Sequence, residues 1–138
     1  MATRHIWAMY VSKNKMETVF RITLFIAGGI NLLPSILAFL PEKISKSYGI
    51  EIPNVNLELL LRHRAILFAI VGGLMVYSAV SKKFYSISVT VGLISMISFI
   101  ILYFLMNGIN PELEKVMKID LIAAIVLLVG FILYKFKS

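Results

Sequence analysis

Apolar residues gather in four long stretches, and the short segments between them hold most of the charged side chains. The stretches cover residues 19–40, 57–80, 84–106 and 116–134. A helix needs about 20 residues, at about 1.5 Å each, to cross the hydrocarbon core of a bilayer. The pattern therefore predicts an all-α fold, an integral membrane four-helix bundle.

The second and fourth stretches reach this length only if they include charged residues. The uncharged run at 65–80 makes about 24 Å of helix and the run at 121–134 about 21 Å, whereas the hydrocarbon core is about 30 Å thick. The triplet Arg62-His63-Arg64 precedes the first run, and Asp120 precedes the second. We therefore expect these side chains at the edge of the core, on the same side of the membrane.

An unpaired charge at this depth is costly, so such residues usually face the bundle and find partners. Arg62 lies on the face of its helix that carries Ala65 and Ala69, so we expect it to point inward and to pair with Asp120. Arg64 lies about 200° further round the helix. We expect Arg64 to reach the lipid head groups.

Two other interpretations of the triplet remain open. Arg62, His63 and Arg64 could form a site for an anion or a lipid head group, because a guanidinium donates two parallel hydrogen bonds to a phosphate or carboxylate. His63 could also act as an acid or base oriented by Asp120. No nucleophile or metal accompanies it, so we predict no catalytic residue, and an enzymatic role stays open.

A local break is predicted inside the first span. Pro34 removes one backbone hydrogen bond and frees the carbonyl of Ile30, which Asn31, Ser35 or water could satisfy. Such a break can line a cavity or can simply kink the helix, so Asn31 joins the candidate binding residues. Small residues mark the packing faces of the spans, because they let helix backbones approach closely. On the first span these are Gly28, Asn31, Ser35 and Ala38, and on the second Ala65, Ala69, Gly72 and Gly73.

The connections carry helix signals of their own. Residues 41–49 begin with proline and end with glycine, which predicts two turns of interfacial helix. Asn56 is the expected N-cap of the second span, and Asn110-Pro111-Glu112 is a start signal for the fourth helix. Residues 1–15 lie before the first span and could form an N-terminal extension or interfacial segment, leaving residues 16–138 as the four-helix domain. Met16 is an alternative start of the chain.

Composition narrows the class of protein. Apolar residues make up 59% of the 138 residues and charged residues 15%, which is typical of a membrane protein. The net charge of +7 does not indicate a nucleic-acid partner, because the basic residues stand at the ends of apolar segments as membrane-surface anchors. There is no cysteine, and the two histidines, His5 and His63, are expected on opposite sides of the membrane. We therefore predict no metal site and no cofactor.

Basic residues also indicate an orientation. With four spans, eight Lys and Arg fall on the side of the termini and six on the other side. The positive-inside rule then places both termini in the cytoplasm of a bacterium, with the chain in the inner membrane.

The block from Pro53 to Phe68, which contains Leu60-Leu61-Arg62-His63-Arg64-Ala65, resembles a "PNL…LLRHRA-LF" pattern of small four-helix bacterial membrane proteins. The segment 29–34 is similar to their first helix, and the likeness covers roughly Met16 to the C-terminus. The helix arrangement is loosely like the DoxX-like group. Some members carry the name phosphopantetheine adenylyltransferase, but the genuine enzymes resemble soluble α/β nucleotidyltransferases, whose composition and motif this chain lacks. The resemblance implies that Arg62, His63 and Arg64 belong to the recognisable core of that family.

Three classes of function follow from these observations. The first is non-enzymatic binding of a lipid-like or anionic ligand, or a role as accessory subunit of a membrane complex; its partners would be membrane lipids, a second copy of the chain or another membrane protein. The second is a small oligomeric transporter, for which Asp120 would be the membrane carboxylate. The third is an intramembrane enzyme acting on a lipid or quinone. Lipid or anion bound beside Arg62 would favour the first class, and flux that needs Asp120 would favour the second.

Overall fold

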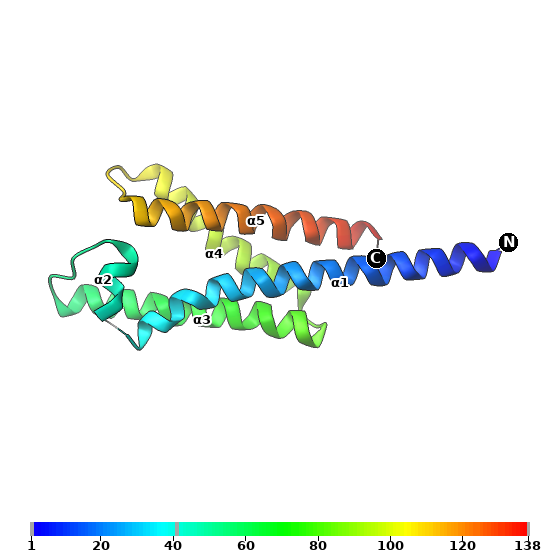
Figure 1. Cartoon of the computed structure of the whole chain (residues 1–138), viewed down its shortest axis with the longest axis horizontal. Helices are drawn as coiled ribbons and strands as arrows, with labels where there is room; N and C mark the ends of the chain where they lie inside the picture. The colour runs from blue at the N-terminus through cyan, green and yellow to red at the C-terminus, as the bar shows by residue number, and fades with distance from the viewer. Residues whose placement is uncertain (1, 41, 138) are drawn as a thin grey trace.

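The computed structural model describes residues 2–40 and 42–137 as helices joined by short connections (Figure 1). The elements are α1 (Ala2–Leu32), the 3-10 helix η1 (Leu33–Ala38), α2 (Glu42–Tyr48), α3 (Val55–Ser81), α4 (Tyr85–Leu105) and α5 (Pro111–Lys137). The described residues contain no strand, which confirms the prediction of an all-α fold.

Four of the helical segments are long and apolar enough to cross a bilayer, and they correspond to the four predicted spans. They are Met9–Ala38, Val55–Ser81, Tyr85–Leu105 and Pro111–Phe136. The chain is therefore a multi-pass membrane protein. Residues 2–15 do not form a separate element, because α1 runs unbroken from Ala2 to Leu32, and its N-terminal end projects beyond the other helices (Figure 1). A position of this segment at the membrane surface stays a prediction.

Asparagine side chains mark the beginnings of α3 and α5. The Oδ1 atom of Asn54 accepts a hydrogen bond from the backbone N–H of Leu57 at 3.0 Å, so the N-cap of α3 is Asn54 and the prediction of Asn56 is wrong by two residues. The Oδ1 atom of Asn110 accepts from the N–H of Leu113 at 2.9 Å, and Pro111 then opens α5 as predicted. The predicted interfacial helix is α2, although Pro41 lies outside the described residues.

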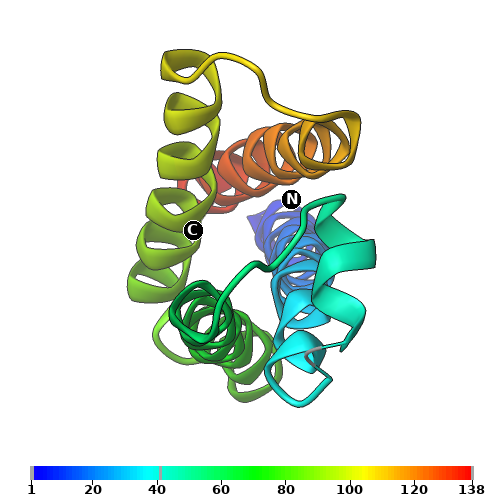
Figure 2. The same ribbon diagram turned by 90° about the vertical axis from the view of Figure 1, so that its left-hand side faces the viewer.

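The four long helices form a ring in the order α1, α3, α4 and α5, in which each helix packs on its two neighbours and α3 lies diagonally across from α5 (Figure 2). Both chain termini lie at one end of the bundle, here called the terminal end (Figure 1). The opposite end, called the loop end, carries α2 and the connection between α4 and α5. From the terminal end, α4 leaves α3 and crosses obliquely toward α5 at the loop end (Figure 1).

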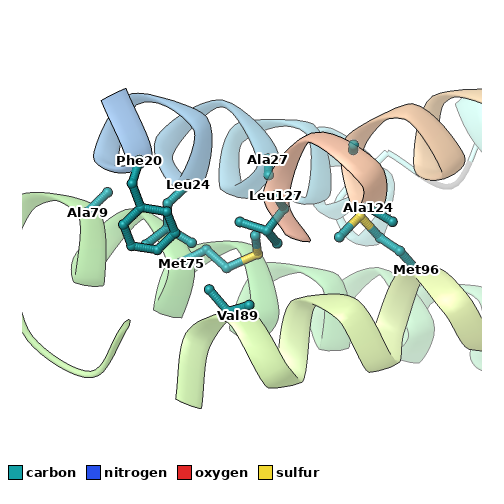
Figure 3. Close-up of a cluster of buried hydrophobic side chains, with 10 residues drawn as sticks. Phe20, Leu24, Ala27, Met75, Ala79, Val89, Met96, Ala124 and Leu127 are labelled. Carbon is teal, nitrogen blue, oxygen red and sulfur yellow. The ribbon is translucent and has the colours of Figure 1, made fainter. Parts of the chain in front are cut away.

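The core of the bundle draws on all four long helices (Figure 3). Its largest fully buried side chains are Phe20 and Leu24 of α1, Met75 of α3, Met96 of α4 and Leu127 of α5. They lie toward the middle and the terminal end of the bundle. The loop end is filled by a second, separate cluster in which α2 packs against η1 and α3.

The predicted small-residue faces of α1 and α3 meet. A Cβ atom at Gly72 would lie 2.6 Å from the carbonyl oxygen of Gly28, and a Cβ atom at Gly28 would lie 3.0 Å from the carbonyl oxygen of Gly72. These distances leave room for hydrogen atoms only, so the two backbones are in direct contact. The neighbouring Gly73 has nothing within 4 Å of its Cβ position, so Gly73 is not part of this contact.

Candidate functional site

Arg64 of α3 points into the loop end of the bundle and lies among three aromatic rings. Its Cζ atom lies 5.4 Å from the ring centre of Tyr48, 5.0 Å from that of Phe68 and 5.1 Å from that of Phe99. These rings come from α2, α3 and α4. A cation within about 6 Å of an aromatic face is attracted by the ring quadrupole, so the three rings hold the guanidinium in place.

The position of Tyr48 depends on how α2 ends. Gly49 has a φ of 61°, the left-handed conformation that stops a helix and favours glycine. The side-chain amide of Asn110 then donates to the carbonyl oxygens of Tyr48 at 2.7 Å and Gly49 at 3.0 Å. Asn110 thereby ties α2 to the beginning of α5 and keeps Tyr48 over Arg64. Burial raises the pKa of the Tyr48 phenol above its usual range, although the nearby positive charge of Arg64 acts in the opposite direction.

Asp120 of α5 lies across the bundle from Arg64. Arg64 lowers and Asp120 raises the pKa of the Tyr48 phenol, so both charges lie close enough to Tyr48 to affect it. The Asp120 carboxylate is partly buried and makes no hydrogen bond or ion pair to any residue that the structure describes. Arg64 and Asp120 therefore attract each other over a distance longer than the 4.0 Å of a contact ion pair.

A cavity of about 460 Å³ extends from Arg64 between α3 and α4. The residues that line it are almost entirely apolar. At the loop end, the α4–α5 connection and the first turn of α5 also line the cavity. The lining residues are Arg64, Leu67, Phe68, Val71, Ser95, Ser98, Phe99, Leu102, Tyr103, Met106, Ile109 and Leu113. The volume falls within the range of about 300–1,000 Å³ typical of small-molecule sites. The cavity exists because α4 leaves α3 as it crosses toward α5.

The cavity has a charged end and an apolar end. Arg64 lies nearest the loop end among its α3 residues, and Val71 lies two turns deeper, about 10 Å along the helix. From Arg64 to Ser81, the last residue of α3, the helix covers about 26 Å, which places Arg64 near the edge of a hydrocarbon core about 30 Å thick. Leu67 and Leu102 are about half exposed, so the cavity opens sideways toward the lipid.

The guanidinium of Arg64 makes no hydrogen bond to any described residue, although an arginine carries five N–H donors. Aromatic faces attract its charge but supply no acceptor oxygen. Arg64 is also the one charged group among the residues that line the cavity. The N–H donors of the Arg64 guanidinium are therefore available to an anionic group that binds at the loop end of the apolar cavity.

The expected ion pair between Arg62 and Asp120 is wrong. The Nη1 atom of Arg62 lies 3.2 Å from Oε1 of Glu58, one helical turn earlier, and its Nε atom donates to the carbonyl oxygen of Ala38 at 2.9 Å. Arg62 therefore lies on the face that packs against η1. The expectation that Arg64 reaches the head groups stays a prediction, and its guanidinium lies among rings of α2, α3 and α4. A helix in a four-membered ring has two packed faces, and the face of Arg64 looks toward α4 and the bundle interior.

His63 and Asn31 do not join this cluster. His63 is exposed on the outer surface of α3, where it borders a groove shared with Arg62. Asn31 is 4% exposed, and its amide donates to the carbonyl oxygen of Ala27 at 3.0 Å. At the predicted break, α1 passes into the 3-10 helix η1, and Asn31 bonds to the backbone of its own helix; a binding role for Asn31 stays a prediction.

The sequence interpretation missed the aromatic partners of Arg64. Phe68 could have been found, because it lies four residues after Arg64 on the same helix face. Tyr48 and Phe99 come from distant elements and gave no such signal. Asp120 was correctly expected near an arginine at the loop end, but that arginine is Arg64.

A second set of polar contacts lies toward the terminal end and holds helices together. The Nε atom of Arg21 donates to the carbonyl oxygen of Ala79 at 2.6 Å, which joins α1 to α3. The Tyr85 hydroxyl donates to Glu17 at 3.0 Å, which joins α4 to α1. Neither pair was predicted from the sequence. Both contacts join neighbouring helices, and none of these four residues lines the Arg64 cavity, so we interpret both as structural contacts.

Among the described residues, no three His, Asp or Glu side chains gather as a metal site. Comparisons with protein-family models, with curated proteins and with solved structures find no match to this chain. The resemblance to the four-helix family with the RHRA block therefore stays a prediction. The candidate site rests on its own geometry.

Proposed function

We propose that this multi-pass membrane protein binds, without catalysis, a lipid-like ligand that carries an anionic head group. The single observation that supports the proposal most is the guanidinium of Arg64, with no hydrogen-bond acceptor from the described residues, at the end of an apolar cavity of about 460 Å³. The head group would bind Arg64 near the membrane edge, and the chain would extend toward the membrane middle. Charge-assisted hydrogen bonds and apolar burial would then act on one molecule.

The shape of the cavity supports an amphiphile over a small free anion. Phosphate or a small carboxylate would leave most of the apolar wall without a partner. Conversely, a fully apolar ligand would leave the N–H donors of Arg64 without an acceptor in a medium of low dielectric constant. An amphiphile that enters sideways past Leu67 and Leu102 meets both requirements.

We further propose that the protein resides in the inner membrane of a bacterium with both termini in the cytoplasm. The excess of basic residues on the side of the termini, eight against six, supports this orientation. In this orientation the loop end, and with it Arg64, lies at the periplasmic edge. The ligand would then come from the periplasmic leaflet.

Native mass spectrometry of the protein, released gently in a neutral maltoside detergent, tests the binding proposal. We expect an anionic amphiphile to stay bound to the wild-type protein and to be lost from Arg64→Leu. Hydrogen bonds to a charged group contribute about 1.5–3 kcal/mol, so the affinity should fall by at least tenfold, and so should the occupancy at ligand concentrations well below saturation. The matched control is Arg62→Leu, which removes a neighbouring arginine that does not line the cavity. Equal retention in both variants would refute the proposal.

A further inference from the structure

A second groove lies toward the terminal end, on the outer surface between α1 and α3. It has a volume of about 330 Å³ and shares no lining residue with the Arg64 cavity. Phe25 and Val80 in its wall are 52% and 64% exposed, so the groove opens directly to the surrounding lipid. The lining residues are Thr18, Arg21, Ile22, Phe25, Ala79 and Val80.

Arg21 is the charged residue that lines this groove, and a hydrogen bond holds its guanidinium in place. The Nε atom donates to the carbonyl oxygen of Ala79 at 2.6 Å. An arginine carries five N–H donors, and the Nη atoms of Arg21 donate to no residue that the structure describes. The contact with Ala79 therefore fixes the guanidinium and leaves its remaining donors available to a ligand in the groove.

The groove has a polar end and an apolar end, in the order that a lipid from the nearer leaflet requires. Lys82 and Lys83 follow the uncharged part of α3 and lie exposed in the turn before α4. Ala79 precedes Lys82 by about 5 Å of helix, so the guanidinium of Arg21 lies within about one turn of these lysines. Phe25 lies one turn deeper on α1, toward the middle of the membrane.

The nearest acid on α1 is engaged elsewhere. Glu17 precedes Arg21 by one turn, and its carboxylate accepts a hydrogen bond from the hydroxyl of Tyr85 on α4 at 3.0 Å. Glu17 does not line the groove, and within the described residues it makes no ion pair with Arg21. The groove and the adjoining turn, with Arg21, Lys82 and Lys83, therefore keep an excess of positive charge.

We propose that this groove binds an anionic phospholipid of the leaflet at the terminal end. The phosphate accepts hydrogen bonds from the Nη atoms of Arg21, and an acyl chain lies along Ile22 and Phe25. Basic pockets between membrane helices bind anionic head groups in this way. A zwitterionic lipid would bring its ammonium group against Lys82 and Lys83, so the site prefers a lipid with net negative charge. It is independent of the Arg64 cavity, which lies toward the opposite end of the bundle.

A single tryptophan in the groove measures which lipid binds there. Trp7→Phe removes the native tryptophan, and Phe25→Trp places a new one on the groove wall. The protein is held in phosphatidylcholine nanodiscs that contain an equal mole fraction of either phosphatidylglycerol or phosphatidylcholine with brominated acyl chains, which quench a nearby indole. Val129→Trp on α5 is the control for bulk lipid, because Val129 is 48% exposed. It lies about 9 Å before Lys135, a depth similar to that of Phe25.

We expect brominated phosphatidylglycerol to quench Phe25→Trp more than brominated phosphatidylcholine does, and both lipids to quench Val129→Trp equally. A basic residue near anionic lipid changes affinity about fivefold, so Arg21→Gln should lower the preference for phosphatidylglycerol about fivefold. Lys135→Gln removes a positive charge near the same end of the bundle but outside the groove, and should leave the preference unchanged.

Equal quenching of Phe25→Trp by the two lipids would overturn the proposal, and so would a preference that Lys135→Gln lowers as much as Arg21→Gln does. If loss of the hydrogen bond to Ala79 prevents Arg21→Gln from folding, the double variant Lys82→Asn/Lys83→Gln decides. Asparagine tolerates the left-handed conformation of Lys82, whose φ is 59°. A lowered preference in this variant supports the site, and an unchanged preference refutes it.

Discussion

The contact between Gly28 and Gly72 predicts a sharp difference between two adjacent alanine substitutions. In Gly72→Ala the new Cβ would lie 2.6 Å from the carbonyl oxygen of Gly28 and 2.9 Å from the backbone nitrogen of Leu32. Backbone atoms cannot swing aside as a flexible side chain can, so α1 and α3 must separate. Over-packing of this kind costs about 1–3 kcal/mol.

Gly73→Ala is the matched control. Its Cβ meets nothing within 4 Å, and it lies on the same helix at the next position. Both substitutions gain the helix propensity of alanine over glycine, about 1 kcal/mol, so this gain cancels in the comparison. We therefore expect Gly72→Ala to be less stable than Gly73→Ala by about 1–3 kcal/mol.

Steric trapping in micelles measures the free energy of unfolding of the two variants under identical conditions. Equal stabilities would show that α1 and α3 do not approach as closely as described. A Gly73→Ala variant less stable than Gly72→Ala would show that the face of α3 that carries Gly73 is packed, by a second copy or another partner.

Three further predictions concern the loop end, the N-terminus and the orientation. Because Arg62 pairs with Glu58 and not with Asp120, losses of detergent thermal stability in Arg62→Leu and Asp120→Leu should add in the double variant; a double variant more stable than the worse single variant would contradict this. A chain that starts at Met16 should insert and accumulate nearly as the full chain does, since Ile6, Trp7 and the apolar residues 9–11 are exposed, whereas loss of folded protein would show that the segment packs. Reporter fusions at the C-terminus and within residues 45–54 should report opposite sides of the membrane, and a periplasmic C-terminus would reverse the proposed orientation.

The fold was predictable from the sequence because lipid imposes strict length and polarity limits on a span. Four apolar stretches of sufficient length define four helices almost without regard to tertiary contacts. The boundaries at Asn110-Pro111 and the short helix before Gly49 also followed from local signals. The predicted start of α3 was wrong by two residues. Asn54 and Asn56 are equally suitable N-caps by sequence, and the conformation of the preceding segment determines which of them caps the helix.

The candidate site was only partly predictable. Its depth followed from helix length, which correctly brought an arginine and Asp120 to the same end of the bundle. The choice between Arg62 and Arg64 was wrong, because the order of helices around the ring decides which face of α3 looks inward. The sequence does not contain that order in any local pattern. The divergence of α4 from α3, which creates the cavity, likewise depends on packing of the whole bundle.

We propose that the cavity between α3 and α4 holds an anionic amphiphile. Photocrosslinking with a palmitate analogue that carries a diazirine in its chain tests it most directly, with the labelled peptides identified by mass spectrometry. We expect labelling concentrated on cavity residues such as Leu67, Val71 and Phe99, reduced at least tenfold by Arg64→Leu and unaffected by Arg62→Leu. Labelling spread evenly over lipid-facing residues such as Ile94 and Ile122, and unchanged by Arg64→Leu, would contradict it.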